Sequence, residues 1–240
     1  MNTSNFNNMK HPIIQTIIAI LLGISVLILS SIVVIVLTKN TNIIISIPAL
    51  SKTLTHTSML VFSVLYIIIL GKRGLQNFGF VWNTKFSIVR IVLISLFIGM
   101  IPSLLNNFIF ETASTNPTAN FTLIEKIIFI WIWASICEEI LTRGLIQGFL
   151  SPFKNIGIKL FNIKISLPVI VGAIFFGSMH LMLLTMGVEL SSVIVIVIFG
   201  IVLGGIAGYQ REITNSLLPA IIVHMCFNIG ASLVSIINLS

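Results

Sequence analysis

Long apolar runs follow one another along almost the whole chain, with only short polar segments between them. The first run, from Pro12 to Leu37, contains no charged residue. A helix crosses a bilayer with roughly 20 apolar residues, and in lipid only helices and closed barrels satisfy every backbone polar group. The first run also exceeds the apolar core of a secretory signal, which has roughly 7 to 15 residues. The pattern therefore predicts membrane-spanning helices, beginning with a retained first span.

Seven such runs can be placed on the sequence. The third is the weakest, because Arg90 lies near its start and Pro102 is expected to kink or end a helix. We predict an all-α fold, a polytopic transmembrane helix bundle of about seven spans, or eight, in one membrane domain. The expected spans are Pro12–Leu37, Thr53–Gly71, Phe86–Leu105, Leu123–Leu150, Ile165–Leu184, Leu190–Tyr209 and Ser216–Ser235.

The composition agrees with a membrane protein and not with a soluble one. Only 8% of the residues are charged, against roughly 25% in an ordinary soluble domain. The 13 lysines and arginines outnumber the 6 acidic residues. In a soluble chain this excess would suggest nucleic acid, but here the basic residues lie in short loops beside apolar spans, as the positive-inside rule expects. We therefore predict a multi-pass protein of the cell membrane, with the lipid bilayer as partner and no nucleic acid.

The basic residues are divided unequally between the two sides of the predicted bundle. By the positive-inside rule the N-terminus is cytoplasmic and, after seven spans, the C-terminus lies outside. The segment from Ser151 to Lys164 mixes lysines with large apolar residues and is expected to rest on the anionic cytoplasmic leaflet. The richer side holds Lys10, Lys72, Arg73, Lys85, Lys154, Lys159, Lys164 and Arg211, and the loops of the other side hold Lys39 and Lys52.

Two local patterns predict how helices begin and pack. Thr122 and Glu125 match a capping box at the start of the fourth span. In the sixth span, Gly200, Gly204 and Gly208 recur every four residues. Such a stripe of small residues lets a neighbouring helix approach closely, so we interpret it as a packing surface.

The fourth span contains three charged residues, each of which costs roughly 2.5–3.5 kcal/mol to insert. Glu139 and Arg143 stand four residues apart, on one helical face, and are expected to form a structural ion pair. Glu138 is turned about 100° away from that face and has no evident partner on its own helix. A carboxylate in a low-dielectric cavity suits general-base work on water. A proton-sharing carboxylate of a transporter is the alternative.

Two further spans carry polar pairs at the same four-residue spacing. Phe176 precedes His180 in the fifth span, and His224 precedes Asn228 in the seventh. Each spacing puts both residues on one helical face. At 1.5 Å per residue, Glu138 and these groups lie at depths that allow them to converge. The other two histidines, His11 and His56, stand near expected helix starts without such companions, and we interpret them as interfacial.

Taken in order, these motifs resemble the signatures of the CPBP family. This family comprises the CAAX-protease and bacteriocin-processing intramembrane peptidases, also called the Abi family. The resemblance runs over roughly Lys126 to Ser235 and includes the glycine-rich sixth span. It implies N-terminal transmembrane helices of uncertain subfamily in residues 1–120 and a CPBP/Abi-like catalytic core in residues 121–240. The motifs are Glu138-Glu139-Ile-Leu-Thr-Arg143, Phe176-x-x-x-His180 and His224-x-x-x-Asn228.

The resemblance also implies roles for the motif residues. Glu138, with His180, would activate the attacking water. His224 and Asn228 would stabilise the oxyanion of the tetrahedral intermediate, which agrees with the ability of an imidazolium and an amide to donate hydrogen bonds to developing negative charge. The remaining two motif residues, Glu139 and Arg143, would give structural support to the site.

The cofactor requirement is open at this point. Glu138, His180 and His224 form a plausible zinc set, and the family has often been called metalloproteases. No His-Glu-x-x-His segment is present, however, and members of the family are also interpreted as glutamate-dependent peptidases that need no metal. We favour direct activation of water by Glu138 and His180, with no cofactor, over a divalent metal such as zinc.

The leading hypothesis is an intramembrane endopeptidase that acts on a membrane-associated peptide or protein. Candidates for the substrate are a pheromone or bacteriocin precursor, a membrane protein, or a prenylated C-terminus. The low charge and Ile-rich composition favour a bacterial host and the first two substrates. The alternatives are a non-catalytic bacteriocin immunity or scaffold protein, and a proton-coupled transporter. A cysteine peptidase is disfavoured, because Cys137 and Cys226 adjoin the motif residues, and adjacent helical residues do not face each other.

Overall fold

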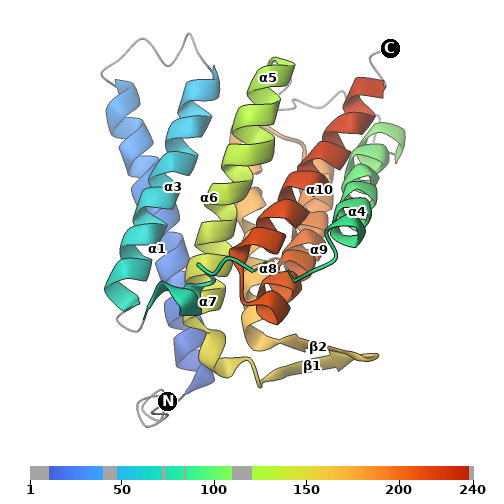
Figure 1. The fold of residues 1–240 in the computed structure, drawn as a ribbon. Coiled ribbons are helices and arrows are strands. Elements are labelled where there is room, and N and C mark those ends of the chain that lie inside the picture. The colour runs from blue at the N-terminus through green and yellow to red at the C-terminus, as the bar shows by residue number, and fades with distance from the viewer. Residues whose placement is uncertain (1–10, 40–47, 72–73, 84, 110–120, 238–240) are drawn as a thin grey trace.

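The computed structural model describes residues 11–39, 48–71, 74–83, 85–109 and 121–237. In this part of the chain, 6 helices are long and apolar enough to cross a membrane. They run side by side and form a bundle (Figure 1). The helices are α1 (Pro12–Lys39), α3 (Pro48–Leu70), α4 (Ile88–Ile109), α8 (Leu167–Met179) with its continuation to Met186, α9 (Leu190–Thr214) and α10 (Leu217–Ile237).

A further helix of the described chain spans residues 123–149 without a break and alternates between α-helical and π-helical segments. Together with the other six it confirms the predicted all-α polytopic bundle of about seven spans. The π-helical geometry is rare and appears often at functional sites. We refer to this element as the fourth helix; its segments are α5 (Leu123–Glu125), η2 (Lys126–Ala134), α6 (Ser135–Glu139), η3 (Ile140–Ile146) and α7 (Gln147–Phe149).

Short elements join the long helices. The strands β1 and β2 form an antiparallel hairpin between the fourth helix and α8. The sequence analysis placed this segment at the membrane surface but did not predict strands, although isoleucines and lysines alternate there with the period of two that favours a strand. The short elements are η1 (Leu75–Phe78), η4 (Ser151–Phe153), β1 (Gly157–Leu160), β2 (Ile163–Ser166) and η5 (His180–Met186).

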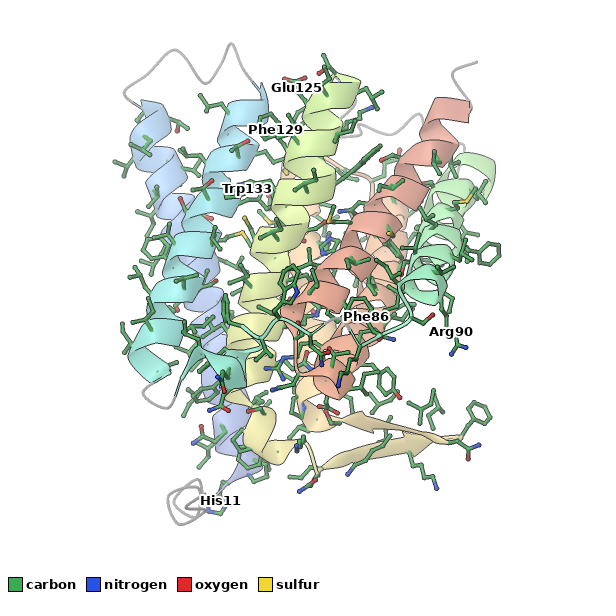
Figure 2. All side chains as sticks on the ribbon, in the orientation of Figure 1. His11, Phe86, Arg90, Glu125, Phe129 and Trp133 are labelled. Carbon is green, nitrogen blue, oxygen red and sulfur yellow. The ribbon has the colours of Figure 1, made fainter. Side chains whose placement is uncertain are left out.

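Several predicted span boundaries differ from the helices of the structure, among them the end of α9, which lies at Thr214 and not at Tyr209. The second helix begins at Pro48, five residues before the predicted start at Thr53. The third continues through Pro102 to Ile109, since a transmembrane helix can satisfy the groups that proline frees through its neighbours. Arg90 points away from the bundle near the start of this helix (Figure 2). The fifth span changes from α8 to the tighter 3-10 geometry of η5 at His180.

The glycine stripe in α9 packs closely on α8, as predicted. A Cβ atom on Gly200 would lie 3.1 Å from the Cα atom of Gly177, and one on Gly204 would lie 2.7 Å from the Cα atom of Ala173. The capping box is also confirmed, because Thr122 Oγ1 accepts from the Glu125 N–H at 3.3 Å and Glu125 Oε2 accepts from the Thr122 N–H at 2.8 Å.

Two apolar cores hold the helices together. The larger one joins Ala19 of α1 and Met59 of α3 to Leu145 of the fourth helix and Phe175 of α8. It therefore contains residues from both sides of the proposed boundary at 120/121, and that division stays a prediction. The smaller core joins α4, α8, α9 and α10; its buried members are Ile91, Phe176, Leu203, Ala207, Ala220, Val223 and Phe227.

The two ends of the bundle differ. The hairpin and the start of α1 lie at one end, and the start of the fourth helix and the end of α10 lie at the other (Figure 1). Arg211, predicted as a loop charge, is instead buried in the last turn of α9, where it donates to the Asn77 carbonyl at 2.7 Å. Lys10, Lys72 and Arg73, which also entered the orientation argument, lie outside the described residues.

Candidate active site

Two consecutive glutamates on α6 contact different partners. Glu138 Oε1 lies 3.0 Å from His56 Nε2, and Glu138 Oε2 lies 3.7 Å from His224 Nε2. Glu139 Oε1 lies 2.9 Å from His224 Nδ1, and its Oε2 lies 3.1 Å from Arg143 Nε. The His224 ring of α10 therefore lies between the two carboxylates, with one ring nitrogen toward each.

The predicted pair of Glu139 and Arg143 is present and fully buried, with 0% exposure of both side chains. The Arg143 guanidinium also donates to Thr142 Oγ1. It lies over the ring of Phe176, with 4.8 Å between the guanidinium carbon and the ring centre. Removing one member of such a buried pair leaves an uncompensated charge. The pair also links the fourth helix to α8 through Phe176 and to α10 through His224.

Phe176 is the aromatic centre of the cluster. Its ring meets those of His180 and His224 edge-on, at centroid distances of 5.1 Å and 5.2 Å. His180 Nδ1 lies 3.0 Å from the Phe176 carbonyl oxygen. Since a carbonyl can only accept, Nδ1 is the donor, and Nε2 is left as the ring nitrogen that can take a proton. The Phe176-x-x-x-His180 motif thus sets both the position and the tautomer of His180.

The helix change at His180 coincides with the closest approach of α9. The Cβ position of Gly200 is 3.6 Å from His180 Nδ1 and 3.1 Å from the Cα atom of Gly177. A larger residue at either glycine would push α9 away from this turn. The first glycine of the stripe therefore packs against the site as well as against a helix.

Asn228 lies one turn beyond His224 on α10 and faces the fourth helix. Its Nδ2 donates to Ser135 Oγ at 3.1 Å and to the Ile130 carbonyl at 3.3 Å. Ser135 precedes Glu138 by three residues, so the Asn228 amide adjoins the cluster. In this structure its hydrogens are directed at the fourth helix.

The interpretation of His56 as interfacial is wrong. His56 is only 7% exposed, and its Nε2 contacts the Glu138 carboxylate. The error follows from the helix boundary: with a start at Thr53 the histidine falls in the first turn, whereas α3 begins at Pro48. Its position inside the expected span Thr53–Gly71 was the signal that could have revealed it. His11, by contrast, is exposed at the start of α1.

The predicted metal candidates do not form a metal site here. Within the described part of the chain, no three His, Cys, Asp or Glu side chains are grouped so as to hold a metal ion. His224 directs its two nitrogens at two carboxylates, and Glu138 Oε1 is taken by His56. The arrangement therefore fits a hydrogen-bonded acid–histidine cluster better than the zinc set of Glu138, His180 and His224.

Comparison with known proteins shows a similarity over the segment that contains the motif residues. Residues 120–230 match the family model described as Type II CAAX prenyl endopeptidase Rce1-like. No curated protein and no solved structure matches the chain. The matched segment contains all three motifs that resemble the CPBP signatures. Residues 120–230 are therefore similar to the Rce1-like type II CAAX prenyl endopeptidases, in agreement with that resemblance.

Proposed function

We propose that this protein hydrolyses a peptide bond of a membrane-associated peptide or protein, with a water molecule activated by Glu138 and His180. The single observation that carries the proposal is the cluster in which Glu138 contacts His56 and His224, and the Phe176 ring contacts both His224 and His180, inside a bundle of membrane-spanning helices. The similarity of residues 120–230 to the endopeptidase family supports the reaction class.

In the proposed reaction Glu138, assisted by His180 Nε2, takes a proton from water while the water oxygen bonds to the scissile carbonyl carbon. The carbonyl π electrons move to its oxygen and form the oxyanion. When the tetrahedral intermediate collapses, the C–N bond breaks and the stored proton passes to the leaving amine. The products are an amine and a carboxylic acid, which then releases its own proton to solvent, and the histidine–glutamate pair returns to its initial state.

His224 and Asn228 are the proposed oxyanion donors. The Glu139 carboxylate accepts from His224 Nδ1 at 2.9 Å, which holds the ring with Nε2 directed toward Glu138. Asn228 would exchange its bonds to Ser135 and Ile130 for the substrate oxygen. Donors directed at developing negative charge stabilise it strongly, and of the two His224 is already held in one orientation by Glu139. Glu139 and Arg143 keep His224 in place and do not themselves touch the substrate.

The substrate class follows from the site's place in the bundle. A site formed by membrane-spanning helices favours substrates that are themselves membrane-associated. We propose a peptide pheromone or bacteriocin precursor, or a membrane protein, of a bacterial host, with the N-terminus of the enzyme in the cytoplasm. The proposed reaction uses no metal ion, because among the described residues no three His, Cys, Asp or Glu side chains are grouped so as to hold one.

The test is cleavage of membrane-associated peptides by the purified protein in liposomes, with products identified by mass spectrometry. Wild type is compared with Glu138→Ala and His224→Ala, and Glu189→Gln serves as a control because Glu189 is exposed at the start of α9. Products from wild type and the control alone would support the proposal. Silence of the wild type across a broad peptide library would favour the immunity or scaffold alternative.

A further inference from the structure

His56 comes from a part of the chain that the family match does not include. The match begins at residue 120, whereas His56 lies on α3. The fourth helix and α3 are joined next to it, because Trp133 Nε1 donates to Thr57 Oγ1 at 3.1 Å. Figure 2 shows Trp133 on the side of the fourth helix that faces α3. The histidine is therefore held against Glu138 by packing as well as by its own bonds.

The hydrogen bonds of His56 define its proton positions. Nδ1 lies 2.8 Å from the Lys52 carbonyl oxygen, which can only accept, so Nδ1 carries a hydrogen. Nε2 lies 3.0 Å from Glu138 Oε1. Two acceptor atoms with no hydrogen between them do not approach this closely, so one proton lies between His56 Nε2 and Glu138 Oε1. Glu138 Oε1 is engaged by this bond, and Oε2 is the oxygen that remains toward His224.

We propose that His56 is a positioning residue for the reaction: it holds Glu138 by Oε1 and thereby presents Oε2 to the attacking water. This proposal rests on the proposed peptidase function. The two carboxylate oxygens then have separate tasks, one structural and one chemical. Displacement of a reacting group by about 1 Å can lower a rate about 100-fold, so a carboxylate free to rotate is expected to work poorly.

The test compares His56→Ala and His56→Gln with wild type, and uses His11→Ala as a control for an exposed histidine. The glutamine amide can donate to Oε1, whereas alanine cannot. We expect His56→Ala to lower kcat about 10- to 100-fold with KM changed less than about threefold, and His56→Gln to recover most of kcat. Full activity of His56→Ala would overturn the proposal. A rise in KM alone would also overturn it.

A second measurement separates this proposal from the peptidase function. In protein labelled with ¹⁵N-histidine, Glu138→Gln should shift the ring signals of His56, and Glu189→Gln should not. Unchanged His56 signals in Glu138→Gln would show that the contact does not exist and overturn the proposal. A shift together with an inactive wild type would instead overturn the peptidase function and, with it, the role of His56 in the reaction.

The hairpin carries an independent inference. Its register pairs Ile158 with Ile165 and Leu160 with Ile163, so these four side chains share one face, because alternate residues point to the same side. The opposite face carries the cross-strand pair of Lys159 and Lys164. The hairpin is thus amphipathic, with one aliphatic and one basic surface.

The aliphatic face is not covered by the bundle. Ile158, Leu160 and Ile163 are 57%, 52% and 49% exposed, and Phe161 at the turn is 88% exposed. The hairpin extends sideways from the end of the bundle, across the direction of the helices (Figure 1). It therefore lies at the end of the bundle, where the helices are expected to leave the bilayer.

We infer that the hairpin, residues 157–166, binds the surface of an anionic lipid leaflet. The aliphatic face and Phe161 enter the interface, and the Lys159 stem extends so that its ammonium group reaches lipid phosphates. The Lys164 ammonium donates to the Asn155 carbonyl at 2.8 Å and keeps two further hydrogens for a phosphate. The combination of apolar residues with lysines on the opposite face is typical of interfacial segments. The hairpin binds lipid, and this binding does not depend on the proteolytic reaction.

The experiment places a nitroxide on Phe161→Cys and measures its collisions with oxygen and with a water-soluble nickel complex in vesicles. The native Cys137 and Cys226 are buried, and a label on Glu189→Cys is the control. We expect interfacial depth in vesicles with phosphatidylglycerol. A Lys159→Gln/Lys164→Gln variant should reduce that depth there, but not in phosphatidylcholine. A label exposed to water in both lipids, or a depth that the lysine changes leave unaltered, would overturn the inference.

Discussion

The guanidinium carbon of Arg143 lies 4.8 Å from the centre of the Phe176 ring, so the buried cation on the fourth helix is covered by an aromatic side chain from α8. The same ring meets His180 and His224. One apolar residue therefore contacts the structural arginine and both histidines to which we assign roles in the reaction.

Phe176→Leu should lower activity far more than Phe175→Leu does, at a similar cost in stability. The shorter side chain leaves both imidazole rings without their edge contacts, and we expect kcat to fall about 10- to 100-fold. The free energy of unfolding should fall by about 1–3 kcal/mol. Phe175→Leu is the matched control, since Phe175 is buried in the other core. Equal losses of kcat in both variants, measured beside thermal unfolding in detergent, would contradict the role of Phe176.

Arg143→Met should destabilise the protein by about 3–5 kcal/mol, because it leaves the buried Glu139 carboxylate without its cation. The double variant Arg143→Met/Glu139→Gln should recover much of that loss. Arg90→Met should have no effect, since Arg90 is exposed. Unfolding curves in detergent measure all three, and a double variant no more stable than Arg143→Met would show that the two charges are not coupled.

Glu138→Gln should abolish cleavage and leave the fold intact. The amide keeps the shape of the side chain but cannot take a proton, and general-base catalysis contributes about 100- to 10,000-fold. Product formation by mass spectrometry and thermal unfolding are measured on the same preparation. Full activity of this variant would exclude Glu138 as the base.

Gly204→Ala and Gly205→Ala test the packing of α9 on α8, because the two glycines are adjacent in the sequence but only Gly204 faces α8. A Cβ on Gly204 would lie 2.7 Å from the Cα atom of Ala173, whereas one on Gly205 would meet nothing within 4 Å. We expect Gly204→Ala to destabilise by about 1–3 kcal/mol and Gly205→Ala to be neutral or to stabilise by up to about 1 kcal/mol. Thermal unfolding that ranks the two variants in the opposite order would reject this packing.

Thorough chelation should leave the activity of the purified enzyme unchanged. In this structure the proposed base and His224 use their polar atoms on each other, on His56 and on Glu139. We measure cleavage before and after dialysis against a strong chelator, and then after addition of zinc. Loss of activity that zinc restores would require a metal and a rearranged site.

Much of this protein could be predicted from the sequence because lipid restricts a chain so severely. Apolar length defines the spans, and the rarity of charge within them singled out Glu138, Glu139 and Arg143. The ion pair of Glu139 with Arg143 and the glycine stripe followed from four-residue spacing alone, because such spacing puts groups on one helical face whatever the rest of the fold does. The motif order was enough to indicate the family that the comparison then found.

The contacts between helices were decided only by the tertiary structure. His56 is 82 residues from Glu138 along the chain, and no periodicity within one helix reports which other helix it will face. A start of α3 displaced by five residues was enough to move His56 from the membrane interface to the site. The meeting of Phe176 with Arg143 and His224 depends likewise on how far α8 is shifted and rotated against its neighbours, which is set by close packing between helices and not by hydropathy.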